Sequence, residues 1–314
     1  MRSFSELSGR NILVTGANGF IGTALVKRLC ECGAEVYALV RSGGDYPKST
    51  FGENHATMVF SDFESGFEKP LTKKLPKIDF LYHCAASGVS TNRLDDKGLV
   101  LTNLALTKSF LELGLRKEVE RFVTLGSGFE YGFGEKRKES SCLNPRSFYA
   151  ASKSACSLLV QTYSFQEDLP TVVIRPFVVY GPGEAESRLT TSVVKAIHSA
   201  KPVKLTQGRQ VIDMLFAGDL IKALLLSAVR EKAVGEILNI CSGKGVTVQE
   251  TVGVILKALG ATNEVQFGAL PDRTSGADKL TGDWSKAQSI LGWHPETCLA
   301  DGVRATIHSI GVAI

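Results

Sequence analysis

Three polar side chains in the middle of the chain have the types and spacing needed to exchange a proton with an alcohol or carbonyl oxygen. Tyr149 and Lys153 are four residues apart, which places both on one face of the helix expected at residues 147–167. An isolated phenol titrates near pH ~10, and an adjacent ammonium favours its ionised form, so such a tyrosine can act near neutral pH. Ser127 closes the preceding expected strand, where its hydroxyl can bond the same oxygen. The sequence therefore predicts a catalytic group of Ser127, Tyr149 and Lys153.

A glycine-rich segment near the N-terminus separates an apolar, strand-like run from an amphipathic stretch. Glycine allows a tight turn and lets backbone N–H groups approach a pyrophosphate, and the N-terminus of the following helix favours negative charge. Because a strand precedes the segment and a helix follows it, we predict a dinucleotide site here rather than a plain structural turn. The residues assigned to it are Gly16, Gly19, Phe20, Ile21 and Gly22.

The end of the second expected strand selects between the two nicotinamide dinucleotides. A carboxylate at this place accepts the ribose hydroxyls of NAD, whereas an arginine pairs with the extra phosphate of NADP. Arg41 and Ser42 occupy it. The sequence therefore predicts that NADP(H) is preferred over NAD(H), with a solvated strand-end arginine as the alternative.

The elements that must position these residues alternate regularly through the first half of the chain. Short, nearly continuous apolar runs separated by amphipathic stretches indicate a parallel sheet covered on both faces. We predict an α/β fold with a doubly wound parallel (Rossmann) sheet and a smaller C-terminal α/β substrate domain. The expected strands are residues 11–15, 35–41, 56–60, 79–85, 121–126 and 171–177, and the helices are residues 20–32, 97–115 and 147–167.

The second half of the chain is less regular. Gly181-Pro182-Gly183 breaks the pattern, a helix-like stretch follows, and the interval up to Arg209 is polar. A strand and a helix then return at residues 211–229 and another strand at 236–241, before two further helical stretches. We assign residues 1–176 plus 211–242 to the dinucleotide-binding domain, and residues 177–210 plus 243–314 to the substrate domain.

Composition excludes several classes of protein. The net charge of +4 is spread along the chain without a block of like charges, which argues against nucleic acid as a partner. The seven cysteines show no metal-ligand spacing, so no metal site is predicted. No stretch approaches the roughly 20 apolar residues of a membrane span, and the first apolar run is too short for a signal peptide. We expect a cytoplasmic protein that does not bind a membrane.

Several segments taken together resemble the extended short-chain dehydrogenase/reductase family, and within it the NAD-dependent epimerase/dehydratase group. The resemblance covers almost the whole chain, and the set of motifs is highly specific. The segments are Thr15-Gly16 to Gly22, Leu125-Gly126-Ser127 to Tyr131-Gly132, Tyr149 to Lys153, Ile174-Arg175-Pro176, Asn239 to Gly243, and Ser285 to Gly302.

The resemblance implies roles for the catalytic group and for further cofactor residues. Tyr149 is then the general acid/base, Lys153 tunes it and holds the nicotinamide ribose, and Ser127 orients the reacting oxygen. The further residues are Asp62 with Phe63 at the adenine, Ala85 at the cofactor backbone, Asn103 steadying the lysine, and Pro176 at the end of the sixth strand. Each of three residues has a competing structural interpretation: Asp62 as a loop cap, Ala85 as a packed small residue and Asn103 as an amide on the helix surface.

On the substrate side, the resemblance implies a nucleotide sugar. In the family, an arginine at the position before Asp213-Met214 often binds the diphosphate, but this chain has Ile212 there. Arg209 or Arg188 could substitute for it, because arginine suits bidentate phosphate contacts, and Arg273 matches a second phosphate position. Ser87 and Phe177 lie where sugar contacts are expected, with packing as the competing account. His83 lies in an expected buried strand and is interpreted as a satisfied core residue.

The residues after Ser127 bear on the reaction. Family members that dehydrate a sugar nucleotide carry an Asp-Glu pair there, but this chain has Gly128 and Phe129, so 4,6-dehydration is not expected. Glu130 follows at a position that is normally apolar in the family, and we assign it no proton-transfer role.

Reductases and epimerases share the catalytic group and differ in what happens to the hydride. In a reductase the cofactor gives its hydride to the sugar and leaves oxidised, whereas in an epimerase it takes a hydride from the sugar and returns it to the other face. Because Arg41 favours NADP(H), we predict an NADPH-dependent reductase of the 4-keto group of a nucleotide-linked 4-keto-6-deoxyhexose. A nucleotide-sugar 4-epimerase is the alternative. An NADP-binding sensor or scaffold is a third interpretation, although such relatives usually lack the Tyr or the Lys. The resemblance also implies a homodimer formed through the helices around Asn103 and Tyr149.

Overall fold

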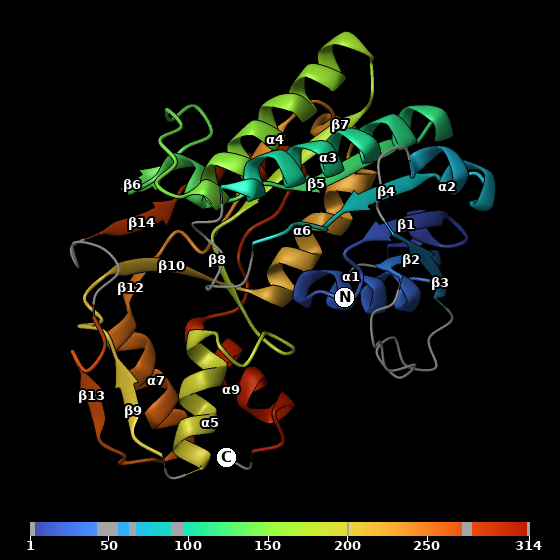
Figure 1. Ribbon diagram of the computed structural model, residues 1–314. Coiled ribbons are helices and arrows are strands. Elements are labelled where there is room, and N and C mark those ends of the chain that lie inside the picture. Colours follow the sequence, from blue (N-terminus) through green and yellow to red (C-terminus); the bar gives the residue numbers. More distant parts are fainter. Residues whose placement is uncertain are drawn as a thin grey trace.

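The computed structural model describes residues 4–42, 56–62, 67–88, 97–199, 201–271 and 278–312. Figure 1 shows a large sheet flanked by long helices, with a smaller group of helices and short strands below it. The small group contains the C-terminal end of the chain.

Seven parallel strands form the large sheet in the order β11-β7-β5-β4-β1-β2-β3. The chain enters at β1, winds outward through β2 and β3, and then returns to β4 to wind outward on the other side. The order therefore reverses between β1 and β4, which confirms the predicted doubly wound fold. The strands are β1 (Asn11–Thr15), β2 (Glu35–Arg41), β3 (Thr57–Ser61), β4 (Phe80–His83), β5 (Arg121–Leu125), β7 (Thr171–Pro176) and β11 (Ile237–Ile240).

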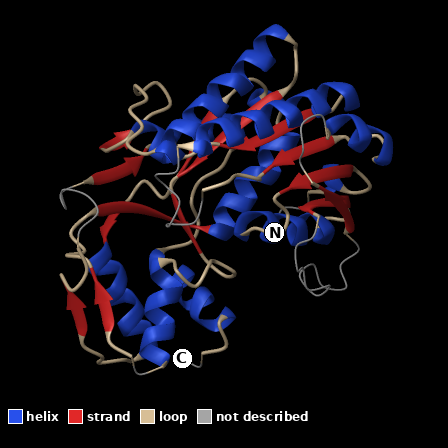
Figure 2. Ribbon diagram, in the orientation of Figure 1, coloured by secondary structure: helices blue, strands red, loops and turns tan. Residues whose placement is uncertain are grey.

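Both faces of this sheet are buried, because successive side chains point to opposite sides and helices cover each side. Ile12 and Val14 of β1 belong to a core shared with α1 and α6, whereas Leu13 belongs to a second core shared with α3 and α4. Figure 2 shows helices on both sides of the sheet. The helices are α1 (Phe20–Glu31), α2 (Glu68–Lys74), α3 (Gly98–Lys117), α4 (Phe148–Gln166) and α6 (Ala217–Val229), with a 3-10 turn η5 (Glu231–Ala233) after α6.

The smaller region contains a sheet of order β12-β10-β14-β6, with β8 beside β10, and a separate pair β13-β9. Its core includes Val194, Ile255 and Ile307, one from each of the helices α5, α7 and α9. The elements are β6 (Gly134–Arg137), β8 (Val178–Tyr180), α5 (Leu189–His198), β9 (Val203–Leu205), β10 (Val211–Phe216), β12 (Gly245–Thr247), α7 (Val248–Leu259), β13 (Val265–Phe267), β14 (Lys279–Gly282), α8 (Ser285–Leu291) and α9 (Leu299–Ser309).

The predicted domain boundaries differ from the observed pairing in three elements. Within residues 211–242, α6 and β11 join the large sheet, but β10 pairs with β8, β12 and β14 in the small one. Within residues 1–176, β6 pairs with β14. In the other direction, α8 contributes Ala287 and Leu291 to the core of the large sheet. An apolar run shows that a segment is buried but not which strand it pairs with, and so the boundary could not be placed from the sequence.

Short elements account for the remaining differences between the expected and the observed secondary structure. Strands of three or four residues, such as β8, β9 and β12, are too short to show a period of two. In the described part of the chain, three helices rather than two follow β11. None of the helices in the described ranges is long and apolar enough to cross a bilayer.

Candidate active site

The predicted catalytic residues and the predicted glycine loop lie at the carboxyl edge of the large sheet, whereas the predicted phosphate arginines do not. Because the strands are parallel, Thr15 of β1, His83 of β4 and Leu125 of β5 all end at this edge. The strand order reverses beside β1, which is where open α/β sheets bind their ligands.

The glycine loop between β1 and α1 is packed closely against β4. Gly16 has a φ of 63°, and a Cβ built on it would lie 2.7 Å from the backbone nitrogen of Ala85. A Cβ on Gly22 would overlap the carbonyl oxygen of Gly16. Gly19 is the N-cap of α1 and supplies no side-chain cap, so the first-turn N–H groups, starting at Phe20 and Ile21, remain available to an anion. This cradle fits a dinucleotide pyrophosphate.

A buried chain of hydrogen bonds fixes the strand ends next to the loop. The backbone N–H of Ala85 donates to Thr15 Oγ1 at 3.2 Å, and Thr15 Oγ1 is 2.9 Å from His83 Nδ1. His83 Nε2 is 3.3 Å from Thr107 Oγ1, which donates to Cys156 Sγ. Burial lowers the pKa of His83 to about 3, so the imidazole is neutral. This confirms His83 as a satisfied core residue and shows that it links β1 and β4 to the helices above them.

Lys153 lies at the carboxyl end of β5. Its buried ammonium donates to the carbonyl oxygen of Leu125 at 2.8 Å, two residues before Ser127. Tyr149 is half-buried one turn earlier on the same face of α4. The structure thus brings Lys153 to the strand end that leads into Ser127, with Tyr149 beside the lysine along the helix.

The local sequence sets where α4 begins. Ser147 is the N-cap, and its side chain accepts a hydrogen bond from the backbone nitrogen of Ala150 at 3.1 Å. The helix consequently starts at Phe148, which places Tyr149 in its first turn.

The Ser127 hydroxyl is oriented by the turn that follows it. Its Oγ accepts from the backbone N–H of Phe129 at 3.2 Å, at the start of the 3-10 turn η4 (Gly128–Tyr131). A hydroxyl that accepts through its oxygen can at the same time donate its hydrogen. This is the polarity needed to stabilise an oxygen that gains negative charge during a reaction.

Asn103 is buried, and its amide contacts the neighbours of the site. Its Oδ1 accepts from the backbone N–H of Ser87 at 2.8 Å, and its Nδ2 donates to the Ser87 carbonyl and to Ser152 Oγ. These bonds make the amide part of the core rather than of the helix surface. Asn103 therefore contacts Lys153 only indirectly, through its hydrogen bond to the adjacent residue Ser152. At Ser87, the hydrogen bonds from Asn103 hold the backbone and not the hydroxyl.

The residues predicted to select the cofactor lie at the ends of β2 and β3. Arg41 pairs in register with Ser61, and the backbone N–H of Ser42 donates to the Ser61 carbonyl at 3.1 Å. Arg41 and Asp62 are both exposed, so a ligand at this edge can reach them. Phe63 lies outside the described residues.

Phe177 is buried next to Gly128, the residue that follows Ser127. Its side chain is 5% exposed and lies 6.5 Å, centroid to centroid, from the stacked ring of Tyr131. A Cβ on Gly128 would lie 2.9 Å from the Phe177 ring. This placement favours packing over a sugar contact. Pro176, the last residue of β7, is half-buried.

The candidate phosphate arginines lie in the smaller region. Arg188 is the N-cap of α5, and its charge acts on the buried carboxylate of Glu184. Arg209 is exposed in the loop before β10, and Arg273 lies outside the described residues. Asp213 follows Ile212, which stands where the family often has an arginine. It is fully buried and accepts hydrogen bonds from the backbone at residues 242, 243 and 282, so it has a structural role.

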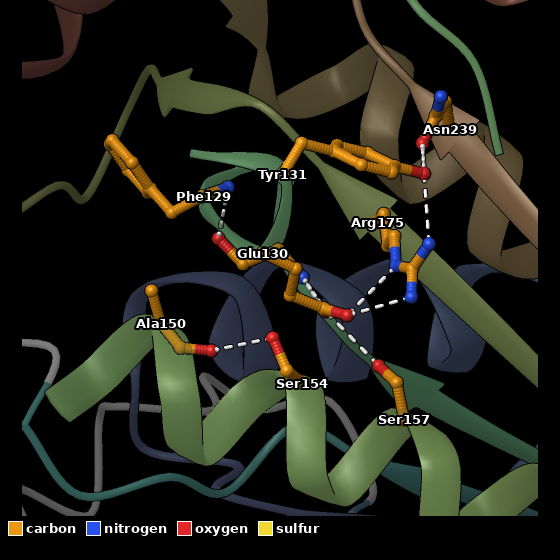
Figure 3. Close-up of polar contacts among 9 residues, drawn as sticks. Phe129, Glu130, Tyr131, Ala150, Ser154, Ser157, Arg175 and Asn239 are labelled. Atoms are coloured by element: carbon orange, nitrogen blue, oxygen red, sulfur yellow. Dashed lines mark hydrogen bonds and ion pairs between the residues drawn. The ribbon is translucent and has the colours of Figure 1, made fainter. Parts of the chain in front are cut away.

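Sequence reasoning missed a buried charged group that contacts Ser127. Glu130 is fully buried and bonds to Ser127, Ser157 and Arg175 (Figure 3). The available signal was a charged residue at a position expected to be apolar, together with an arginine inside an expected buried strand. Among the described residues, no group of three His, Cys, Asp or Glu side chains could hold a metal ion.

Comparison with known proteins adds to this geometry. The model of a family described as "NAD dependent epimerase/dehydratase family" matches residues 12–241. The chain is 29% identical to UDP-glucose 4-epimerase of Mycolicibacterium smegmatis, covering 94% of this chain and 96% of that protein. It is 26% identical to dTDP-4-dehydro-6-deoxy-D-allose reductase of a Streptomyces species, covering 92% and 93%. Among solved structures, DesIV, a dTDP-glucose 4,6-dehydratase of Streptomyces venezuelae with NAD and TYD bound, has a TM-score of 0.85 at 26% identity, covering 96% and 97%.

Proposed function

Because this chain belongs to the NAD-dependent epimerase/dehydratase family, we propose that it uses NADPH to reduce the 4-keto group of a nucleotide-linked 4-keto-6-deoxyhexose. The observation that carries the proposal is the gathering of Ser127, Lys153 and Tyr149 at the sheet edge beside the glycine loop. The likeness to a 4-dehydro-6-deoxy sugar-nucleotide reductase supports it.

The surroundings of Ser127 favour ketoreduction over dehydration. Elimination of water from the sugar needs an additional acid and base, and Gly128 and Phe129 can supply neither. The Phe177 ring fills the space next to Gly128, so an acidic side chain there would need the ring to move. The dehydratase likeness of the fold is therefore not a reason to assign dehydration to this chain.

The proposed reaction uses each catalytic side chain once. A bound nicotinamide cofactor supplies the hydride to the carbonyl carbon. Tyr149 donates its phenolic proton to the carbonyl oxygen as the C–O double bond becomes single, and the Ser127 hydroxyl donates a hydrogen bond to the same oxygen. The Lys153 ammonium favours the phenolate that remains, and a proton from solvent restores Tyr149. The product is the alcohol.

The cofactor and substrate assignments follow from particular residues. Gly16, Gly22 and the N-terminus of α1 fit the pyrophosphate, and Arg41 fits the extra phosphate of NADP. We assign the substrate diphosphate to Arg209 or Arg188, since guanidinium groups bind phosphate in bidentate fashion.

A substrate assay tests the proposed reaction. Purified protein with NADPH and a nucleotide-linked 4-keto-6-deoxyhexose is expected to consume the two in equal amounts and to form one alcohol stereoisomer. The second candidate is 4-epimerisation, favoured by the likeness to UDP-glucose 4-epimerase. Interconversion of saturated sugar nucleotides without net cofactor change would contradict the reductase and support the epimerase.

We also propose that two copies associate through α3 and α4. These helices carry three large apolar side chains that are strongly exposed: Leu101 (74%), Leu158 (55%) and Phe165 (82%). Light scattering is expected to give about twice the chain mass of 33.8 kDa. Phe165→Glu should shift the mass toward one copy, whereas Val234→Glu, which also places a charge on an exposed apolar site, should not. A single-copy mass for the unaltered protein would contradict the dimer.

A further inference from the structure

Glu130 has hydrogen-bond partners on both of its carboxylate oxygens although it is fully buried. Oε1 accepts from the backbone N–H of Ser127 at 2.7 Å and from Ser157 Oγ on α4 at 3.0 Å. Oε2 accepts from Arg175 Nε at 2.9 Å and from its Nη2 at 2.8 Å. Figure 3 shows the carboxylate between η4, the helix α4 and the strand β7.

Arg175 anchors this carboxylate to the large sheet. Its side chain is 2% exposed on β7, and its Nη1 donates to the hydroxyl of Tyr131 at 2.8 Å. The same hydroxyl donates to Asn239 Oδ1 on β11 at 2.8 Å. The turn that follows Ser127 is thus tied through Glu130 and Tyr131 to two neighbouring strands.

The backbone around Ser127 leaves little room for a different arrangement. A Cβ on Gly126 would lie 2.5 Å from Glu130 Oε1 and 3.1 Å from Ser157 Oγ. On the other side, Gly128 lies against the Phe177 ring. Two glycines therefore let the carboxylate and the ring approach the peptide units on either side of Ser127.

Stability alone does not explain why the buried pair of Glu130 and Arg175 is charged. Replacing a buried ion pair by apolar side chains of similar volume is often neutral or stabilising, so an ion pair is weak evidence for a stabilising role. The four directed hydrogen bonds to the Glu130 carboxylate, in contrast, fix one orientation of the groups that donate them. One of those donors is the peptide N–H of Ser127.

We propose that Glu130 is a positioning residue that holds the Ser127 peptide, and with it the Ser127 hydroxyl, in the orientation needed to bond the reacting oxygen. This rests on the proposed function, because it assumes that Ser127 bonds that oxygen. Glu130 moves no proton in this role. Arg175 acts with it by holding Oε2, which leaves Oε1 to Ser127 and Ser157.

Glu130→Gln is the first test. All four groups around the carboxylate donate hydrogen bonds, and the amide oxygen is expected to face Arg175, since bonds to the guanidinium are stronger. The amide NH2 then faces the Ser127 N–H, a contact between two donors. We expect kcat to fall roughly 10- to 100-fold with KM changed less than about threefold. Glu112→Gln, which alters a carboxylate bonded to Tyr163 elsewhere between α3 and α4, should leave both nearly unchanged.

Two double variants separate positioning from stability. Glu130→Leu with Arg175→Met removes both charges and leaves the Ser127 N–H without its acceptor. Glu130→Gln with Arg175→Met also removes both charges, but frees the amide oxygen to face Ser127. Both lose the Arg175 bond to Tyr131 equally. At similar Tm, the Gln–Met variant is expected to recover kcat to a greater extent than the Leu–Met variant.

Hydrogen exchange gives a readout that does not need the substrate. The Ser127 amide should exchange faster in the Leu–Met variant than in the Gln–Met variant and the unaltered protein. Equal exchange in all three, or kcat values that simply follow Tm, would overturn the positioning role. If the unaltered protein turns over no keto sugar, the proposed reaction fails, and the exchange data still decide whether Glu130 holds Ser127.

Discussion

Replacing Tyr149 by Phe is expected to lower kcat roughly 10²- to 10⁴-fold, the range in which a positioned general acid contributes to a reaction. The ring remains to pack at the start of α4, and only the hydroxyl that donates the proton is lost. The affinity for the cofactor, measured by fluorescence titration, should change less than about threefold, because the glycine loop and Arg41 are untouched.

Tyr163→Phe is the matched control for this prediction. It removes a hydroxyl from the same helix, where the phenol donates to Glu112 Oε1 at 2.7 Å. The control should keep its kcat within about twofold, because Glu112 lies outside the catalytic group. Full activity of Tyr149→Phe would remove the acid from the proposed mechanism. If the unaltered chain also shows no turnover while binding NADP, the result would favour the sensor or scaffold interpretation.

Replacing Arg41 by Asp is expected to weaken NADPH binding roughly 100-fold and to leave NADH binding nearly unchanged. The exposed guanidinium at the end of β2 can pair with the extra phosphate of NADP, and hydrogen bonds between charged groups contribute about 1.5 to 3 kcal/mol. An aspartate there repels that phosphate but can accept hydrogen bonds from the ribose hydroxyls of NADH. Dissociation constants for both cofactors at one ionic strength measure the difference.

Lys232→Asp controls for the change in net charge. It alters the charge of an exposed residue by the same amount. The residue lies in η5, which three residues separate from β11, the edge strand of the parallel sheet opposite β3. The substitution should weaken NADPH and NADH binding equally and only slightly. Equal losses for both cofactors in Arg41→Asp would show that Arg41 does not select NADP.

The sequence determined the parts of the molecule that depend on local residue patterns. The glycines at 16, 19 and 22 indicated a tight strand-to-helix turn because their lack of a side chain is needed there, and the structure places Gly16 in the left-handed region. The continuous apolar runs indicated strands buried on both faces, from which the doubly wound sheet followed. The four-residue spacing of Tyr149 and Lys153 placed them on one helix face.

The tertiary structure decided which of these elements meet. Pairing placed β10 in the small sheet, because partner choice depends on contacts between residues distant in the sequence. Packing put Phe177 against Gly128 in the core rather than in an open site, and Asn103 against Ser152 rather than Lys153. Glu130 and Arg175 are 45 residues apart and become partners only because η4 folds against β7. A buried charge is tolerated only where a partner neutralises it, and local sequence cannot show where that partner lies.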